Sequence, residues 1–504
     1  MNKKTKTLMV VGTSSSAGKS LLVTGLCHYF ARKGVSVAPF KAQNMSNNAA
    51  VCPGGGEIGR AQAVQALAAG LKPSVVMNPV LIKPESDGQA QVIVNGKPWK
   101  SLTAGDYYDQ RKMLWKEITQ SLDSLRDEYE LVIIEGAGSP VEMNLKKNDL
   151  VNMKVAEYAD APTLIVGDID RGGIFSQLLG TYWLLSRSEQ ELIKGFVVNK
   201  FRGIIELFTD GIEIIEEKSG IPVLGVIPYL YDLNIPEEDS VALENLPVQL
   251  RTAKDQLVIG VVNLPRISNF DDFDPLDQED GVRLVYFRNP EQIADLDALI
   301  LPGTKSTLAD LDWLDRTGFS KAIQDFAENG GNVVGICGGY QLLGERIENE
   351  GGLESSLGSR NGLGLMPVVT RFLPEKTTSL VSVQVMGNVS WLRDIAGSLL
   401  EGYEIHMGQS TSENSWLTIK TDDSGREGME DGCITADGRI WGCYLHGIFE
   451  NQSVRRAWLR NLGWVGQDNQ SMQESPFQKS LLDLSHALER SLDLGYLEEI
   501  IWGK

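Results

Sequence analysis

The chain of 504 residues has no long apolar run. No uninterrupted apolar stretch approaches the roughly 20 residues that cross a bilayer. Only Leu8 to Val11 follow the basic first residues before a glycine-rich turn, whereas the apolar part of a signal peptide needs about 7–15 residues. The sequence therefore predicts a cytoplasmic protein without a membrane partner.

Cysteine is scarce as well. The five cysteines are odd in number, widely scattered and never paired as Cys-x-x-Cys. This spacing disfavours a disulfide framework and a zinc knuckle, and it leaves an individual reactive thiol open. The five positions are Cys27, Cys52, Cys337, Cys433 and Cys443.

Positive charge is also in deficit, because 47 basic residues stand against 67 acidic ones and the net charge is −20. A general binder of nucleic acid or of an anionic membrane is disfavoured, since no long basic block offsets this charge. Any anionic substrate must be held by local lysines, arginines and backbone N–H groups.

What the sequence does contain is a repeated α/β pattern. From residue 7 to about 228, short β-branched apolar runs alternate with helical stretches, and a second such series begins at residue 257. This alternation predicts doubly wound domains with parallel sheets. The chain is too long for one hydrophobic core. We expect domains over residues 1–235 and 256–455, a linker over 236–255, and a helical extension over 456–504 with one amphipathic helix from about 476 to 502.

A glycine-rich loop follows the first predicted strand and opens a helix. It runs from Gly12 and Thr13 to Gly18, Lys19 and Ser20, one residue longer than the spacing G-x-x-x-x-G-K-[ST]. Such a loop wraps phosphate oxygens, the lysine reaches the β- and γ-phosphates, and the serine hydroxyl binds Mg²⁺. We therefore expect these five residues to bind ATP or GTP; a Ser/Gly-rich turn without a nucleotide is the alternative.

Two further strand ends favour the nucleotide. Residues 131–135 form an apolar run that delivers Glu135 into a Gly-Ala-Gly turn, a usual position for a carboxylate at a Mg²⁺ site. Asn199 ends another strand with an amide able to read a purine edge. Each signal is weak alone, but in this order they predict Mg²⁺ at Ser20 and Glu135 and nucleotide contact at Asn199.

The second α/β series contains a candidate thiol nucleophile. Gly335-Ile-Cys337-Gly338-Gly339 joins a strand to a helix, which is the cysteine form of the G-x-S-x-G elbow. The helix N-terminus favours the thiolate, and the N–H of Gly338 is expected to face the developing oxyanion. A second N–H is expected from Gly303, after a neighbouring strand. The alternative is a small buried cysteine.

A thiol nucleophile needs a base, and histidine is rare. His28 and His486 lie in predicted helices, where surface or core positions are the better interpretation. His446 follows an apolar run and precedes a glycine, so it stands at a strand end and is the preferred base over His406.

Taken together, these segments resemble the cobyric acid synthases, glutamine-dependent amidotransferases of cobalamin biosynthesis. The Gln-Asn-Met-Ser stretch at residues 43–46 is the most specific part. The N-terminal half also resembles dethiobiotin synthetase. The other matching segments are residues 39–48, 56–62, 78–84, 134–139, 168–173, 199–202, 301–305, 402–406 and 444–447.

The resemblance implies a P-loop synthetase domain followed by a class I glutamine amidotransferase-like domain. It implies amidation of the b, d, e and g carboxylates of adenosylcobyrinic acid a,c-diamide to adenosylcobyric acid, using ATP, Mg²⁺ and glutamine. ATP would form acyl phosphates, Cys337 and His446 would release ammonia from glutamine, and an enclosed passage would carry it. Lys41 resembles a lysine of dethiobiotin synthetase near the transferred phosphoryl group; a surface lysine is the alternative.

Several points stay open at this level. Ile448 stands where many triad amidotransferases have a glutamate, so Cys337 and His446 could act as a dyad, or Glu404 or Glu450 could orient the imidazole. A cobyrinic acid a,c-diamide synthase and a ParA-like ATPase switch with an inactive glutaminase-like domain are the competing functions. The order of amidation, the corrinoid-contacting residues and the oligomeric state are not predicted.

Overall fold

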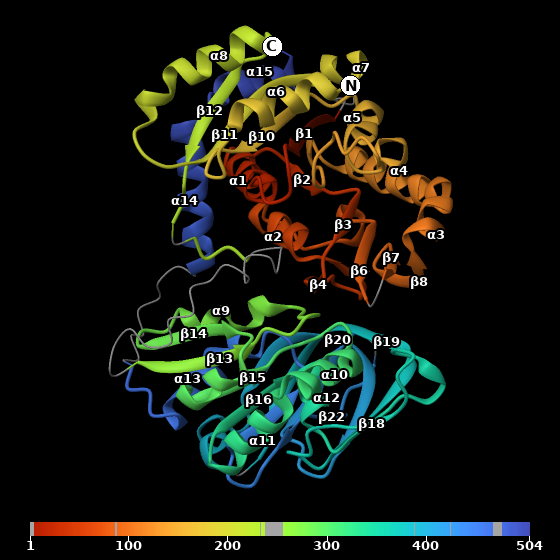
Figure 1. The fold of residues 1–504 in the computed structure, drawn as a ribbon, viewed down its shortest axis with the longest axis vertical. Coiled ribbons are helices and arrows are strands. Elements are labelled where there is room, and N and C mark those ends of the chain that lie inside the picture. Colours follow the sequence, from red (N-terminus) through yellow and green to blue (C-terminus); the bar gives the residue numbers. More distant parts are fainter. Residues whose placement is uncertain are drawn as a thin grey trace.

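The computed structural model describes residues 5–85, 88–231, 233–236, 256–387, 389–423, 425–466 and 476–503. It has two lobes, each built on an α/β sheet (Figure 1), so the expected pair of α/β domains is confirmed. All but residue 236 of the predicted linker lies outside the described residues. Within the described part of the chain, no helix is both long and apolar enough to span a membrane.

The first domain is organised around a fully parallel sheet with the order β12-β11-β10-β1-β9-β2. Helices cover both faces, which is why its strands read as continuous apolar runs. Leu8 and Val10 of β1 pack on one face, and Met9 and Val11 pack on the other. The strands are β1 (Lys6–Gly12), β2 (Val37–Phe40), β9 (Leu131–Glu135), β10 (Thr163–Asp168), β11 (Ile193–Phe201) and β12 (Val223–Pro228).

The helices of this domain connect consecutive strands, as expected for a doubly wound fold. Because each crossover returns the chain to the same end of the sheet, the loops after β1, β2, β9 and β11 gather at one edge. The helices are α1 (Lys19–Arg32), α2 (Arg60–Ala68), α3 (Ala104–Asp109), α4 (Arg111–Glu128), α5 (Met153–Ala159), α6 (Ile174–Leu184), α7 (Arg187–Leu192) and α8 (Thr209–Ser219).

A smaller sheet, inserted between β2 and α4, lies between the two domains (Figure 1). One of its faces packs on the first core through Ile82 and Val92. The other face packs through Leu81 and Ile93 against Tyr403 and other residues of the second domain. Its strands are β3 (Gln43–Met45), β6 (Val80–Pro84), β7 (Gln89–Val94) and β8 (Lys97–Thr103), and the neighbouring hairpin is β4 (Ala49–Val51) with β5 (Glu57–Gly59).

The second domain contains a sheet with the order β14-β13-β15-β16-β24-β23, parallel except for β23. Its strands are β13 (Leu257–Val262), β14 (Val282–Phe287), β15 (Ala298–Leu301), β16 (Asn332–Ile336), β23 (Cys433–Ile434) and β24 (Ile440–Cys443). The helices are α9 (Asp274–Asp277), α10 (Thr307–Thr317), α11 (Phe319–Glu328), α12 (Gly338–Leu343) and α13 (Gln452–Asn461).

A second, mainly antiparallel sheet accounts for the strand-rich later part of this domain. Its long β19 and β20 pair over most of their length and carry Tyr403 and His406 toward the first domain. The strands are β17 (Arg346–Glu348), β18 (Arg360–Asn361), β19 (Val368–Val385), β20 (Leu399–Ser412), β21 (Leu417–Asp422) and β22 (Glu430–Asp431).

The C-terminal helices return to the first domain, where they appear in blue beside its sheet (Figure 1). The single helix predicted over about 476–502 is instead two, α14 (Pro476–Ser491) and α15 (Leu494–Trp502). Between them, Asp493 N donates to Leu224 O of β12 at 2.8 Å, and the Asp493 side chain accepts from Tyr496 N at 2.9 Å. A sheet-edge hydrogen bond and a helix cap therefore divide the predicted helix.

Leu488 of α14 provides a test of this packing. It is 1% exposed and belongs to the core formed with β1 and α1. A Cβ on Gly25 of α1 would lie only 2.4 Å from Leu488 Cδ1, so the two helices are in close contact. Leu488→Ala should lower the free energy of unfolding of the first domain by about 2–5 kcal/mol, because it leaves a cavity there. Urea denaturation measures this change.

The exposed Gln478 of the same helix gives the control. Gln478→Ala should change the free energy of unfolding by less than about 0.5 kcal/mol. Equal stability of the two variants would contradict a structural contribution of α14 to the first domain.

Candidate active sites

The phosphate loop joins β1 to α1 in a conformation that requires its glycines. Gly18 has φ of 97°, and a Cβ there would lie 2.0 Å from Asn199 Nδ2. A Cβ on Gly12 would lie 3.0 Å from Lys19 Nζ. The Lys19 ammonium donates to Ser14 O at 3.0 Å and to Gly138 O at 3.2 Å. The loop thus closes around the lysine, as a phosphate-binding loop does.

Two of the predicted nucleotide contacts, Thr13 and Asn199, form hydrogen bonds within the protein. Thr13 N donates to Val166 O at 2.9 Å, and its hydroxyl donates to Gln177 at 3.1 Å, so Thr13 is directed to the sheet and to α6. The structure gives no support to Thr13 as a phosphate donor. Asn199 Nδ2 donates to Ala17 O at 3.0 Å, so its side chain holds the phosphate loop in place. Purine recognition by Asn199 stays a prediction.

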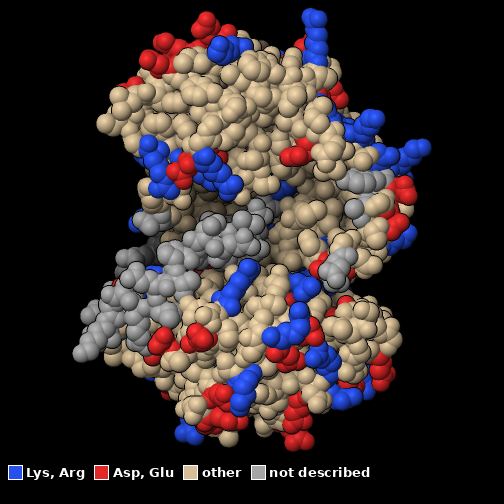
Figure 2. All heavy atoms as spheres, in the orientation of Figure 1, with Lys and Arg blue, Asp and Glu red and all other residues tan. Residues whose placement is uncertain are grey.

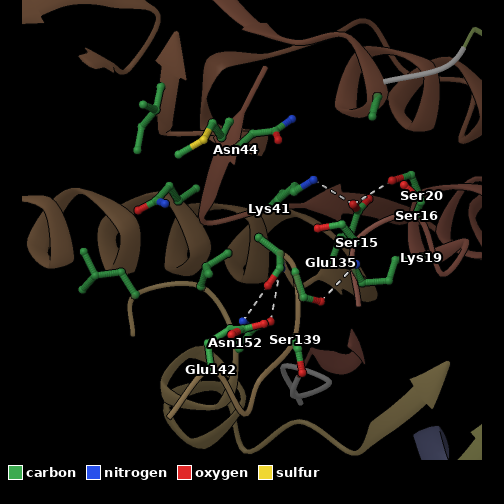
Figure 3. A pocket seen from close by; sticks show the side chains of 18 of the residues that line it. Ser15, Ser16, Lys19, Ser20, Lys41, Asn44, Glu135, Ser139, Glu142 and Asn152 are labelled. Atoms are coloured by element: carbon green, nitrogen blue, oxygen red, sulfur yellow. Dashed lines mark hydrogen bonds and ion pairs between the residues drawn. The ribbon is translucent and has the colours of Figure 1, made fainter. Parts of the chain in front are cut away.

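Glu135 is the electrostatic centre of this site. Its side chain is fully buried, Ser20 Oγ donates to its Oε1 at 2.8 Å, and Lys41 Nζ lies 2.8 Å from the same oxygen (Figure 3). Burial alone would raise the pKa of Glu135, but Lys41, Gln65 and Lys19 hold it below its usual value. The group is therefore a carboxylate at neutral pH. Lys41 is only 4% exposed, so the surface-lysine alternative is wrong.

The residues present fit a magnesium ion bound together with a nucleotide. A hydroxyl and an anionic carboxylate lie side by side at Ser20 and Glu135, and both are the oxygen ligands that Mg²⁺ prefers. In the described part of the chain, no group of three or more His, Cys, Asp and Glu side chains is arranged to hold a metal. At a nucleotide site, water and substrate phosphates usually complete the coordination of Mg²⁺.

A cavity of about 1200 Å³ opens beside the loop. It is larger than the sites of most small ligands, which occupy about 300–1000 Å³. Four lysines line it (Lys19, Lys41, Lys146 and Lys200), and so do four acidic residues (Glu85, Glu135, Glu142 and Asp149). The lining as a whole therefore has no excess of positive charge, but it provides cations at the site in a chain with a net charge of −20. Figure 2 shows a hollow between the lobes with Lys and Arg side chains at its border. The expected local cations are therefore present.

Cys337 lies at the turn between β16 and α12. Its φ of 53° and ψ of −109° are strained for a residue with a side chain, as expected for a nucleophile elbow. A Cβ on Gly339 would lie 1.9 Å from Leu301 O, and one on Gly338 would lie 2.6 Å from Thr304 Cγ2. The glycines therefore allow the elbow to pack against the turn after β15.

Gly303 lies in that turn, and a Cβ there would lie 3.2 Å from His446 Cε1. Gly338 lines the same cavity of about 240 Å³ as Cys337 and His446. Both glycines therefore lie next to the thiol site. Their role as oxyanion donors stays a prediction.

The partner of His446 is Asp272, which the sequence did not single out. His446 Nδ1 lies 2.6 Å from Asp272 Oδ2, and Gly447 N donates to Asp272 Oδ1 at 3.0 Å. Glu404 instead contacts His406 and Arg426. Neither Glu404 nor Glu450 is the residue that orients His446 here.

Burial alone would lower the pKa of His446, but Asp272 and, to a smaller degree, Cys337 raise it to about 10. The imidazolium form is therefore favoured at neutral pH, as in a thiolate–imidazolium pair. His406 stacks on Tyr444 with ring centroids 3.8 Å apart and has Nδ1 2.7 Å from Gly408 O. The preference for His446 over His406 agrees with this geometry.

Comparison with known proteins identifies both halves. Residues 258–454 match the family model of the CobB/CobQ-like glutamine amidotransferase domain. Residues 8–241 match that of the CobQ/CobB/MinD/ParA nucleotide binding domain. A cobyric acid synthase of Chloroflexus aurantiacus is 54% identical over 94% of this chain and 95% of its own length.

The chain belongs to the family of cobyric acid synthases. A second relative of that name, from Herpetosiphon aurantiacus, is 54% identical over 91% of both chains. One from Salmonella heidelberg is 46% identical over 91% of this chain and 90% of its own. The resemblance drawn from the sequence is confirmed, and so is the expectation of an enzyme that is a glutamine-using, ATP-dependent amide ligase.

One feature of the sequence could have pointed to Asp272. Asn269-Phe-Asp-Asp272 comes shortly after β13, the first strand of the second domain. The carboxyl ends of parallel strands meet at one edge of a sheet, so acidic residues there are expected near the elbow. Sequence alone does not indicate which of several such carboxylates reaches His446.

Asp272→Asn tests this assignment. The substitution removes the negative charge that raises the pKa of His446, so that pKa should fall toward its ordinary value. Release of ammonia needs the imidazolium as proton donor, and activity is lost as pH rises through the His446 pKa. The basic limb of glutamine hydrolysis should therefore move to lower pH, and kcat should fall by about a hundredfold or more.

Glu404→Gln is the control, because Glu404 is an equally buried carboxylate without contact to His446. Its pH profile should match that of the unmodified protein. The other charged or titratable groups around the pair of Asp272 and His446 are Cys337, Asp271, Arg60, Tyr403 and Glu450. The assignment of Asp272 as the partner of His446 would be wrong if the fall in glutamine hydrolysis at high pH shifted in Glu404→Gln and not in Asp272→Asn.

Proposed function

We propose that the protein converts adenosylcobyrinic acid a,c-diamide to adenosylcobyric acid by amidating the b, d, e and g carboxylates, with ATP and glutamine. The observation that carries the proposal is the presence of two formed sites on either side of one thin sheet. Glu135 and the phosphate loop face one cavity, and Cys337 with His446 faces the other. A cytoplasmic location stays a prediction from the sequence.

The first half-reaction would take place at Cys337. The thiolate attacks the glutamine carboxamide, the N–H groups of Gly303 and Gly338 receive the oxyanion, and the His446 imidazolium gives a proton to the departing ammonia. Water then attacks the thioester, His446 accepts its proton, and glutamate leaves with the thiol restored. Asp272 keeps the imidazole oriented throughout.

The second half-reaction would take place beside the phosphate loop. A corrinoid carboxylate oxygen attacks the γ-phosphorus, and ADP leaves. Ammonia then displaces phosphate from the acyl phosphate to give the amide. Lys19 and Lys41 would stabilise the charge on the transferred group, and Mg²⁺ held by Ser20 and Glu135 would neutralise phosphate charge.

The small sheet separates the two cavities. Ile82 and Val92 of the small sheet line the larger cavity, whereas Lys83 and Gln91 of the same strands line the smaller one. Glu85 borders both cavities. This alternation of side chains supports transfer of ammonia across the sheet near Glu85.

The relatives and the geometry of the thiol site also bear on the two competing functions. A cobyrinic acid a,c-diamide synthase would share the domain plan, but the relatives described above carry the name of cobyric acid synthase. A switch with an inactive glutaminase-like domain does not need the assembled Cys337, His446 and Asp272. Incubation with the corrinoid, Mg·ATP and glutamine, followed by mass spectrometry, tests the proposal. Four successive replacements of a carboxyl OH by NH₂ are expected in the product masses, and a different number would contradict the proposal.

Cys337→Ala should abolish synthesis from glutamine and leave synthesis from high ammonium at raised pH, because only release of ammonia uses the thiol. Product formation with each nitrogen source measures the two activities. Cys443→Ala, at a buried cysteine outside the elbow, is the control and should keep both. Loss of ammonium-dependent synthesis in Cys337→Ala would mean that the thiol is needed for the fold or for the other site.

Lys41→Met should lower kcat with ammonium by about a hundredfold or more, since a charge that stabilises the phosphoryl transition state is lost. Its glutamine hydrolysis should stay near that of the unmodified protein. Lys33→Met removes a lysine of the same domain that pairs with Glu498 outside the cavity and should change neither rate. Unchanged kcat and KM in Lys41→Met would contradict the role.

A further inference from the structure

Helix α2 of the first domain contacts Glu135 of one candidate site and the segment that carries Asp272 of the other. Near its middle, Gln62 and Gln65 donate through their Nε2 atoms to Glu135 Oε2. At its first residue, Arg60 Nη2 lies 2.6 Å from Asp271 Oδ2 of the second domain. Asp271 directly precedes Asp272, the partner of His446. A helix of nine residues, about 13 Å long at 1.5 Å per residue, thus reaches from the proposed metal ligand to the glutaminase site.

The positive charge of Arg60 compensates the buried negative charge of Asp271. Asp271 is 3% exposed, and neither of its carboxylate oxygens accepts a hydrogen bond of ordinary geometry in the described part of the chain. Burial raises the pKa of Asp271, and the charge of Arg60 opposes this effect. A buried carboxylate without a counter-charge is strongly unfavourable. Loss of Arg60 should therefore rearrange the segment that also carries Asp272.

A second contact from the same part of the first domain reaches the other side of His446. Asn269 N donates to Asn48 Oδ1 at 2.7 Å, and Ala49 N donates to Asn269 Oδ1 at 3.0 Å. Asn269 Nδ2 then donates to the hydroxyl of Tyr403 at 3.2 Å. The Tyr403 ring stacks on His446 with centroids 5.1 Å apart and planes 13° apart.

We propose that Arg60, a residue of the nucleotide-binding domain, is a positioning residue of the glutaminase site. Through Asp271 it fixes the segment that carries Asp272, and Asp272 orients His446. Arg60 touches neither the thiol nor its cavity, so it acts on the rate of glutamine hydrolysis and not on glutamine binding. This inference rests on the proposed roles of Cys337 and His446.

The helix also provides a physical route between the two reactions. Glu135 holds α2 through Gln62 and Gln65, and the same helix delivers Arg60 to Asp271. A nucleotide with Mg²⁺ at Ser20 and Glu135 would compete for the carboxylate oxygen atoms that Gln62 and Gln65 contact. The rate of glutamine hydrolysis is therefore expected to depend on nucleotide binding through Arg60.

Arg60→Gln in the full-length protein tests the positioning role. Glutaminase kcat should fall at least about tenfold, whereas KM for glutamine and the rate of ammonium-dependent synthesis should stay within about twofold. Arg60→Lys, which keeps the charge, should retain more of kcat. An unchanged glutaminase kcat, or equal losses in both half-reactions, would overturn the proposal.

Asp423→Ala is the matched control. Asp423 Oδ2 accepts from Gly54 N at 3.1 Å, so it contacts the β4–β5 hairpin across the same interface. Its glutaminase kcat should stay within about twofold of the unmodified protein. An equal fall in Asp423→Ala would show that general domain docking, and not the contact of Arg60 with Asp271, sets the rate.

A double-mutant cycle tests whether Arg60 acts through Asp271. Asp271→Asn should lower glutaminase kcat by itself, and the variant with both Arg60→Gln and Asp271→Asn should be no slower than Arg60→Gln alone. Additive losses would mean that Arg60 acts by another route and would overturn the assigned path.

The dependence on nucleotide is measured with Mg²⁺ and a non-hydrolysable ATP analogue, which should change the glutaminase rate of the unmodified protein and not that of Arg60→Gln. An unmodified protein that does not respond would overturn the coupling through α2. Failure of the proposed function gives a different result, because Cys337→Ala would then hydrolyse glutamine as fast as the unmodified protein.

Discussion

The buried carboxylate of Glu135 is the constraint on which the first domain depends. A charged group with no exposed surface is tolerated only when nearby donors and a counter-charge replace its water. The chain provides these from three places: Ser20 lies in the first turn of α1, Lys41 follows β2, and Gln65 lies on α2. The need to compensate one charge thus brings the phosphate loop, the second strand and the inserted segment to one point.

Compensation of a buried charge also holds the two domains together. Glu57 of β5 is fully buried between Lys83 of the first domain and Lys376 of the second. Burial alone would raise the pKa of Glu57, but the two lysines lower it to about 2. Burial lowers the pKa of Lys376 to about 7 in spite of Glu57. Because these charges are compensated across the interface, the orientation of the domains, and with it the distance between the two cavities, is specified by more than apolar contact.

The inserted segment between β2 and α4 connects the two candidate sites. It supplies the thin sheet between the two cavities, the hairpin that contacts the second domain, and the helix that carries Arg60. The Gln-Asn-Met-Ser stretch, which was the most specific sign of the family, lies at its beginning. The stretch most specific to the family thus lies in the segment between the two candidate sites, whereas the phosphate loop and the elbow are motifs that many families share.

The sequence by itself determined the α/β class of both domains, the phosphate loop, Glu135, Lys41, the elbow of Cys337 and the choice of His446. These follow from local patterns, since apolar period, glycine positions and strand ends act over a few residues. Only the tertiary structure decided that Asp272 partners His446, that Thr13 faces the sheet, that the C-terminal helix divides at Asp493 and returns to the first domain, and that Arg60 reaches Asp271. Each of these contacts joins groups that are far apart in the sequence. Such groups need a partner because folding buries a charge or a backbone polar group, and the partner is fixed only when the whole chain has folded.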